Sequence, residues 1–444
     1  MNITNFSQHI FRISLIILVF VSGGISASFE SGPFPYLKEG YISSVKFFSE
    51  LFQQRSNLLI KSSYTGEGVV NINKSKIFDG MTVIQGYFPG GNKAILLSSD
   101  GKVLHEWIID YFSIWPAPKH IRSETIPKSE FNNHTQGIIV NSDGSIVVNV
   151  SERGSAKLDK CGDVKWTLNY QNHHVITETP EGNYWIPSNR AINEIDENLL
   201  LGLISKEALL DQEIRHNNEF EQLILLFDNE GNLIKELSVL NSLINSGFER
   251  HLYDSFLIST FQPTHINDIE LVTKELANKI KNVSSGDLLV SIRQMHLLII
   301  MDQFTGEIKW SHQGQWIRQH DPDITPEGNI RLFNNSRKNF SFNRPSGSNL
   351  IELDPETEES WIVYPKVGQP SFYTDIMGTH QQLENGNILI TESRAGRVFE
   401  ITADGEIVWD FVLPYDEEYA SLIESSERIS NDFFTVQDWN CPRK

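Results

Sequence analysis

The sequence predicts an all-β fold, a six-bladed β-propeller with a short N-terminal helical segment. Two observations lead to this fold class. Six hairpin phrases recur, each with a turn of Asp, Asn or Gly followed by alternating apolar residues: SSDGKVLHEW, DKCGDVKWTL, DNEGNLIKEL, DQFTGEIKW, DPETEESWIVY and TADGEIVWDF. They repeat every ~55 residues, as expected for one four-stranded blade. Stacked sandwiches, the rival architecture, do not require the same phrase in every unit.

The extreme N-terminus resembles a targeting segment. Arg12 precedes an apolar run, Ile13 to Val21, and small residues follow as far as Ala27. This order predicts a secretory signal peptide over residues 1–27. A membrane anchor is the alternative, because Ile13 to Phe29 is nearly free of charge. Either reading places the body of the protein outside the cytoplasm, in the periplasm or secreted.

Residues 28–75 are expected to form a helix and a loop. Tyr41, Val45, Phe48 and Leu51 recur at helical spacing and predict one amphipathic helix over about residues 35–56. The propeller then takes residues 76–444. Its repeats are interrupted by helical insertions near 190–220 and 238–258.

Composition bounds the function. The chain has 444 residues, 39% hydrophobic residues and a formal net charge of −20. This charge argues against nucleic acid as a partner, which requires a basic face. An anionic small molecule would need a local concentration of His and Arg. Cys161 and Cys441 form no disulfide framework or zinc pattern, and two isolated thiols are favoured over a long-range bridge.

Histidines recur ahead of the Gly-Asn turns. His174 lies eight residues before Gly182 and His320 eight before Gly328, whereas His134 precedes its glycine by ten and His380 by six. In the fourth unit, His265 stands where the inner strand should begin. Inner strands line the channel of a propeller, so residues at one register converge on one point. We therefore expect these histidines to share a pocket.

A metal site is one alternative use of such a cluster, because imidazoles bind zinc or copper. However, no pair of histidines has helical HxxxH spacing. Asp321 and Asp268 each follow close on a histidine, and Asp321 would point to the opposite face of its strand. The sequence therefore predicts no metal site and no cofactor.

Several phrases together resemble the arylsulfotransferase family of six-bladed propellers. They are HHVITETPEGN, PTHINDI with a following SIR, QHDPDITPEGNIRLFNNS and GTHQQLENGNILITESRAGRVFEITADGEIVWDF, after an entry of KSKIFDGMTVIQGY and LLSSDGKVLHEW. The resemblance covers about residues 75–415. It implies transfer of a sulfuryl group from a phenolic sulfate ester to a phenolic acceptor, without a nucleotide donor.

The resemblance also implies roles for single residues. His320 of the QHD phrase corresponds to the nucleophile, which forms a sulfohistidine in a ping-pong mechanism. Arg293, His265 and His174 are the other implied catalytic residues. Asn267, His380 and His134 are expected to contact substrate. The gap between His265 and Arg293 contains the charged stretch TKELANKIKN, so the reach of Arg293 depends on how that stretch folds.

Trp316, Phe372, Tyr373 and Trp185 are candidates for a wall against the phenol ring, with core packing as the other role. A non-catalytic extracytoplasmic propeller that binds an anionic or aromatic ligand is the alternative function. A quinone-cofactor dehydrogenase is a third, but it leaves the inner-strand histidines unexplained. The oligomeric state does not follow from the sequence.

Overall fold

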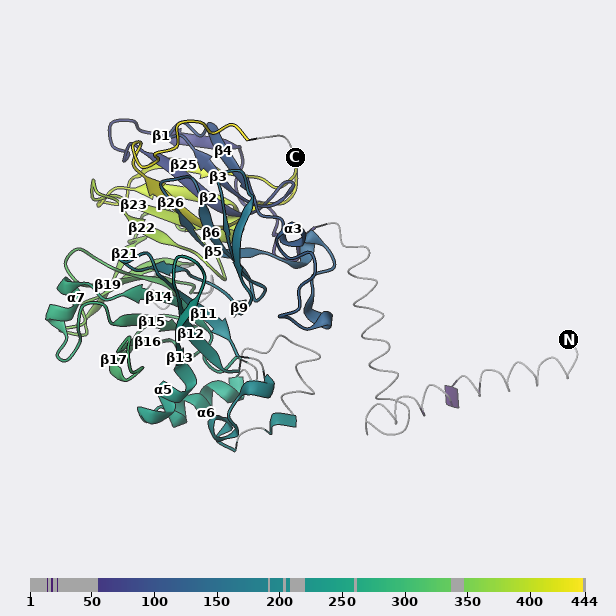
Figure 1. Ribbon diagram of the computed structural model, residues 1–444. Coiled ribbons are helices and arrows are strands. Elements are labelled where there is room, and N and C mark those ends of the chain that lie inside the picture. The colour runs from purple at the N-terminus through teal and green to yellow at the C-terminus, as the bar shows by residue number, and fades with distance from the viewer. Residues whose placement is uncertain are drawn as a thin grey trace, which may run out of the picture. The chain divides into compact units, whose positions relative to one another are not determined.

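The computed structural model describes residues 55–190, 192–202, 205–207, 220–258, 262–336 and 347–441, with the isolated residues 14, 17, 18 and 22. The expected targeting segment at 1–27 and almost all of the expected helix at 35–56 lie outside these residues. The chain divides into two compact units, Met1–Ser56 and Asn57–Lys444. The second unit contains six antiparallel sheets, as the hairpin repeat predicts, so the six-bladed propeller is confirmed (Figure 1).

Blades one to three come first in the chain. Blade one joins a C-terminal strand to three N-terminal ones, in the order β26 (Leu422–Ile429), β2 (Met81–Phe88), β3 (Gly91–Leu97) and β4 (Val103–Ile108). Blade two contains β5 (Thr135–Val140), β6 (Ile146–Val150), β7 (Gly154–Leu158) and β8 (Val164–Leu168). Blade three contains β9 (Gln171–Asn172), β10 (Thr177–Glu178), β11 (Tyr184–Asn189), β12 (Gln222–Phe227) and β13 (Leu233–Ser238).

Blades four to six complete the ring. Blade four contains β14 (Ile266–Leu271), β15 (Leu288–Ile292), β16 (Leu297–Met301) and β17 (Ile308–Gln313). Blade five contains β18 (His320–Ile324), β19 (Ile330–Asn334), β20 (Asn349–Leu353) and β21 (Ser360–Tyr364). Blade six contains β22 (His380–Gln382), β23 (Ile388–Glu392), β24 (Arg397–Ile401) and β25 (Ile407–Val412), and β1 (Gly68–Ile72) pairs with its outer edge.

Short helices occupy the connections. They are α3 (Tyr111–Ile114), α5 (Val239–Asn245), α6 (Glu249–Ile258) and α7 (Lys274–Lys279), with 3-10 turns η1 (Ser123–Thr125), η2 (Glu130–Asn132), η3 (Ile192–Glu194), η4 (Glu197–Leu200), η5 (Arg293–Met295) and η6 (Ser393–Ala395). Within the described residues, no helix is both long and apolar enough to cross a membrane. The stretch TKELANKIKN forms α7 inside the β14–β15 hairpin, so it leaves the two strands paired.

Three tryptophans of the closing hairpins form hydrogen bonds to the next blade. Trp107 in β4 donates from Nε1 to the carbonyl of Gly144 in the next blade, at 2.8 Å. Trp166 reaches Asn229 of blade three in the same way, and Trp409 reaches Ser99 of blade one, at 2.9 and 2.8 Å. A buried indole needs a partner for its N–H. Each of these tryptophans thus fastens an outer strand to the neighbouring blade.

The first and last strands of the propeller close the ring. β26 supplies the inner strand of blade one, and β1 the outer strand of blade six. Arg428 of β26 forms an ion pair with Glu400 of β24 at 3.0 Å, and both side chains are fully buried. The first and last blades are therefore joined by strand pairing and by a buried charge pair.

The two cysteines form a disulfide, so the expectation of two isolated thiols is wrong. Cys161 and Cys441 are joined across 280 residues of sequence, with Cα atoms 5.4 Å apart. The segment after β26 runs back over blade two, where Thr435 N–H donates to Ser142 O at 2.8 Å and Trp439 packs on His105. These contacts deliver Cys441 to the β7–β8 turn, and nothing in the spacing of the cysteines indicates that return.

Candidate functional site

A cavity of about 370 Å³ opens at the axis of the propeller. All six blades contribute to its lining. Six of the seven site residues expected from the sequence line this cavity: His134, His174, His265, Asn267, Arg293 and His320. The long connection between β14 and β15 does not prevent Arg293 from reaching it, because α7 lies within the hairpin and the N–H of Arg293 bonds to His265 O at 3.0 Å.

β-bulges direct several side chains into this cavity. The inner strands β5, β14 and β18 each break their register near the start, at Gln136, Asn267 and Asp321. A bulge adds a residue to one strand and changes where its side chain points. All three bulged residues line the cavity.

Two of the histidines also have backbone conformations that side chains rarely adopt. His174 has φ 53° and His265 has φ 55°, in the left-handed region. Such conformations cost free energy and persist only where the surrounding structure enforces them. Their recurrence in successive blades indicates that the fold holds both imidazoles in place.

The imidazole of His320 is fixed in one tautomer. Its Nδ1 lies 2.9 Å from the carbonyl oxygen of Arg318 and 2.6 Å from Oδ1 of Asn335. Both atoms accept hydrogen bonds, so Nδ1 carries the proton. Nε2 is left with its lone pair. A neutral imidazole with a free Nε2 is the form required of a nucleophile.

Asn335 was not identified from the sequence. Its Nδ2 donates to the carbonyls of Met377 and Thr374 at 2.7 and 3.1 Å, which fixes Oδ1 toward His320. A register signal for it exists, because Asn335 follows Gly328 by seven residues, as Arg293 follows Gly286. The same count that located the histidines, continued past the turn, would have found it.

A second hydrogen-bond chain sets the proton of His174. Gln222 accepts at Oε1 from the N–H of Ile266, so its Nε2 donates, to Nε2 of His173 at 3.3 Å. His173 must then carry its proton on Nδ1, which lies 2.8 Å from Nδ1 of His174. His174 consequently holds its proton on Nε2, where the imidazole can donate a hydrogen bond to an anion. His174 lines the cavity and His173 supports it from behind.

The site keeps its histidines neutral. Burial, and next the charge of Arg293, lower the pKa of His320 and of His265 to about 3. Burial lowers the pKa of His174 well below its usual range, and that of His134 to about 4. Arg293 thus provides the main positive charge among these groups at neutral pH, because the imidazoles bind no second proton.

Asn267 and the paired rings of His174 and His265 belong to the same side of the cavity as His320. Asn267 donates from Nδ2 to the carbonyl oxygen of Gln319 at 2.7 Å, so the residue before His320 orients the amide. The rings of His174 and His265 meet edge to face with centroids 5.0 Å apart. His174, His265 and His320 therefore come together from blades three, four and five.

The remaining wall is largely apolar. Leu58, Ile138, Val175, Ile376 and Met377 line it. The aromatic candidates are elsewhere: Trp185, Trp316 and Phe372 are almost fully buried in the core, and Tyr373 does not line the cavity. These four aromatic residues therefore form no wall of this cavity.

Glu424 of β26 also lines this cavity and was not anticipated. Its side chain is buried, and burial raises its pKa well above the usual range. Because Glu424 belongs to the strand that closes the ring, sequence repeats in the middle of the chain gave no signal for it.

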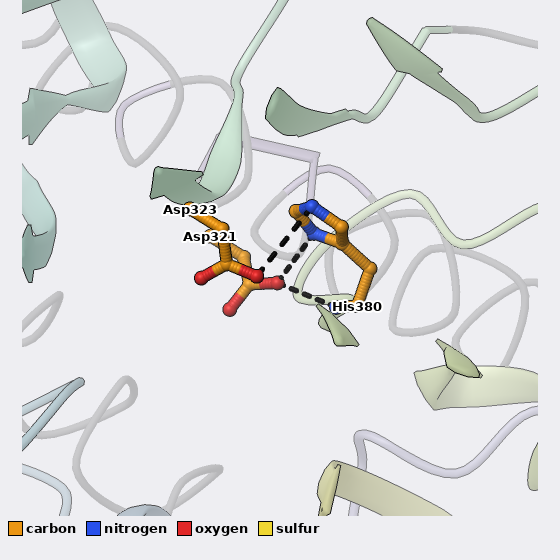
Figure 2. A group of neighbouring side chains, drawn as sticks. All are labelled: Asp321, Asp323 and His380. Atoms are coloured by element: carbon orange, nitrogen blue, oxygen red, sulfur yellow. Dashed lines mark hydrogen bonds and ion pairs between the residues drawn. The ribbon is translucent and has the colours of Figure 1, made fainter. Parts of the chain in front are cut away.

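His380 does not line the cavity. Its side chain turns toward the carboxylates of Asp321 and Asp323 on the neighbouring inner strand (Figure 2). His380 precedes its glycine by six residues rather than eight, and in the structure it pairs with Ile390 two positions from the strand end. Burial raises the pKa of both Asp321 and Asp323 to about 7.

Fold and site together define a six-bladed propeller with a histidine- and arginine-lined cavity on its axis. The chain belongs to the arylsulfotransferase family: the family model for Arylsulfotransferase (ASST) matches residues 134–413, more than half of the chain and all of blades two to six. Membership indicates sulfuryl transfer as the class of reaction and aryl sulfates and phenols as the class of substrates. No curated protein matches this sequence.

Several solved structures are similar to the chain. A protein of unknown function from Bacteroides caccae has a TM-score of 0.48 and 11% identity, over 79% of this chain and 99% of that one. Hydrazine synthase from Kuenenia stuttgartiensis has a TM-score of 0.41 and 9% identity, over 70% of this chain and 71% of that one. Virginiamycin B lyase from Staphylococcus aureus has a TM-score of 0.36 and 11% identity, over 62% of this chain and 69% of that one. All three TM-scores are below 0.5, so none of them bears on the function.

Proposed function

We propose that this protein transfers a sulfuryl group from a phenolic sulfate ester to a phenolic acceptor through a sulfohistidine at His320. The observation that carries the proposal is the fixed tautomer of His320, with Nδ1–H held by Arg318 O and Asn335 Oδ1 and Nε2 left with its lone pair. Family membership supports the reaction class.

In the first half-reaction, Nε2 of His320 attacks sulfur, and the S–N bond forms as the S–O bond to the aryl group breaks. The departing phenolate takes the electron pair of that bond and takes up a proton from water as it leaves. In the second half-reaction, the oxygen of the acceptor phenol attacks the same sulfur, releases its proton, and restores the imidazole. Two easier displacements thus replace one difficult displacement.

The groups around His320 suit the charge that moves. The equatorial oxygens of the transferred group carry negative charge, as in phosphoryl transfer. Arg293 offers a planar fork of donors, and His174 offers the N–H on Nε2. Each preorganised donor is worth ~3 kcal/mol of barrier. His265, which faces His174, is placed to exchange the proton of the phenol.

The substrate then lies across the cavity. His174, His265 and His320 belong to blades three to five, whereas Ile138, Ile376 and Met377 come from blades two and six or the connection before it. An aryl sulfate has one charged end and one apolar end. We assign the sulfuryl group to the histidines and Arg293 and the ring to the apolar wall.

We also propose that the protein works outside the cytoplasm. The bridge between Cys161 and Cys441 supports an oxidising compartment. The apolar segment after Arg12 supports export, either as a cleaved signal peptide or as an anchor.

The test is release of nitrophenol from p-nitrophenyl sulfate by the purified protein, with and without phenol. We expect release to rise with phenol and to fall at least a thousandfold in His320→Ala. The matched control is His312→Ala, because His312 packs on Trp310 and Trp316, away from the cavity. Full release by His320→Ala would refute the mechanism. Saturable binding of the ester without turnover would instead identify a ligand-binding propeller.

A further inference from the structure

A second cluster of polar side chains lies on the inner strands β18 and β22. One oxygen each from Asp321 and Asp323 and one ring nitrogen of His380 all lie within 4.8 Å of one another. The three side chains face one another between the two strands (Figure 2). The mechanism proposed above uses none of them.

The tautomer of His380 is defined by its contacts. Nδ1 lies 2.7 Å from Oδ2 of Asp321, which also accepts from the backbone N–H of His380. Nδ1 therefore carries the proton, and Nε2 has the lone pair. The side chain is only 1% exposed, and Nε2 has no hydrogen-bond partner in the described structure.

That lone pair faces a carboxylate. Oδ2 of Asp323 lies 3.5 Å from Nε2 of His380. When Asp323 is ionised, the two electron-pair donors face each other without a hydrogen between them and repel, unless a positive charge lies between or beside them. The separation is close to that of two neighbouring ligands on one metal ion, each bound at about 2.1 Å.

Further carboxyl groups lie next to this pair. Asp268 and Glu270 are on β14, the inner strand next to β18. Asp268 is 6% exposed, and its Oδ1 has no hydrogen-bond partner in the described structure. Arg331, which lies opposite Asp323 on β19, is already engaged with Glu352 at 2.9 Å. A buried carboxylate is stable when it is paired or when it coordinates a metal.

We propose that Nε2 of His380 and the carboxylate of Asp323 bind one divalent metal ion in the channel. Asp321 orients His380 through Nδ1–H, as carboxylates commonly do behind metal-bound histidines. Asp323 is 34% exposed, which leaves coordination positions for water.

The donor set indicates the kind of metal. Ca²⁺ and Mg²⁺ prefer oxygen ligands alone, whereas an imidazole with carboxylates suits Mn²⁺ or Zn²⁺. The ion would lie next to the bulge at Asp321, the residue that follows His320. Its role is to hold that strand, and it takes no part in the sulfuryl chemistry.

The test uses the full chain after treatment with a chelator and dialysis. Mn²⁺ is titrated in, and the loss of the electron paramagnetic resonance signal of free Mn²⁺ reports binding. We expect one tight site per chain, displaced by Zn²⁺ but not by a tenfold excess of Ca²⁺. Asp323→Asn and His380→Gln should each weaken binding at least tenfold.

Glu427→Gln is the matched control. Glu427 is an exposed carboxylate on the inner strand β26, outside the cluster, so its removal should change the affinity less than twofold. An equal loss in Glu427→Gln and Asp323→Asn would indicate a diffuse counter-ion and overturn the proposal. Absence of a stoichiometric site in the unaltered protein would overturn it too, whether or not the variants fold.

Discussion

Replacing Asn335 with leucine tests whether the tautomer of His320 matters. The variant removes the acceptor at 2.6 Å from Nδ1 but leaves the carbonyl of Arg318 at 2.9 Å. One hydrogen bond is worth ~1–1.5 kcal/mol, and each 1.4 kcal/mol is a factor of ten in rate. We therefore expect kcat for sulfuryl transfer to fall about tenfold, because the imidazole spends more time in the wrong tautomer or orientation.

The same change should cost stability. The carbonyls of Met377 and Thr374 both lose the donor that Nδ2 supplies. A buried polar group left without a partner costs ~1–3 kcal/mol. We expect a loss of roughly 2–4 kcal/mol in the free energy of unfolding, measured by urea denaturation.

Asn387→Leu separates the two effects. Asn387 is also buried and donates from Nδ2 to Lys76 O at 2.7 Å, but it has no contact with His320. Both variants should lose stability, and only Asn335→Leu should lose kcat, measured per folded enzyme by initial rates at saturating donor. Equal kcat in the two variants would refute the role of Asn335 in holding the imidazole.

Three further outcomes follow from the same site and fold. Because burial and Arg293 lower the pKa of His320 to about 3, kcat/KM for the donor should stay level as the pH falls from 8 to 5, whereas a histidine with the ordinary pKa of ~6.5 would lose activity ~30-fold; a pH–rate profile that falls near pH 6.5 would contradict this. Arg293→Lys should lower kcat/KM about a hundredfold, because a point charge cannot replace the planar fork, and unchanged kinetics would remove Arg293 from the site. Cys161→Ser should cost ~2–5 kcal/mol of stability and lower Tm in calorimetry; a Tm unaffected both by this change and by reductant would show that the bridge to Cys441 does not stabilise the protein.

Much of the architecture was predictable because the repeat consists of short local sequence patterns. Each closing hairpin carries its own turn residues, and the structure contains the corresponding blade for all six. Counting from the glycine turn placed His174 and His320 on the same cavity, because a strand has a fixed rise per residue. Arg293 also reached it, although α7 interrupts its hairpin.

Other parts depend on contacts between distant segments. Cys441 meets Cys161 only because the chain returns over blade two after β26, which no local pattern encodes. His380 shares the histidine pattern, but it precedes its glycine by six residues instead of eight. Its ring faces Asp321 and not the cavity. Glu424 lines the cavity because the last strand completes the first blade.

The way in which the ring closes ties the cavity to the completeness of the chain. Glu424 and Ser425, which form part of the cavity wall, lie on β26, the strand of the propeller that is synthesised last. A product that stops before residue 422 lacks this wall and leaves β2 without its inner partner. A ribosome that still holds residues 422–429 therefore holds back the finished cavity as well. Chains that lack β26 would expose an open sheet edge to proteolysis, whereas chains that include it have both a closed ring and a complete cavity.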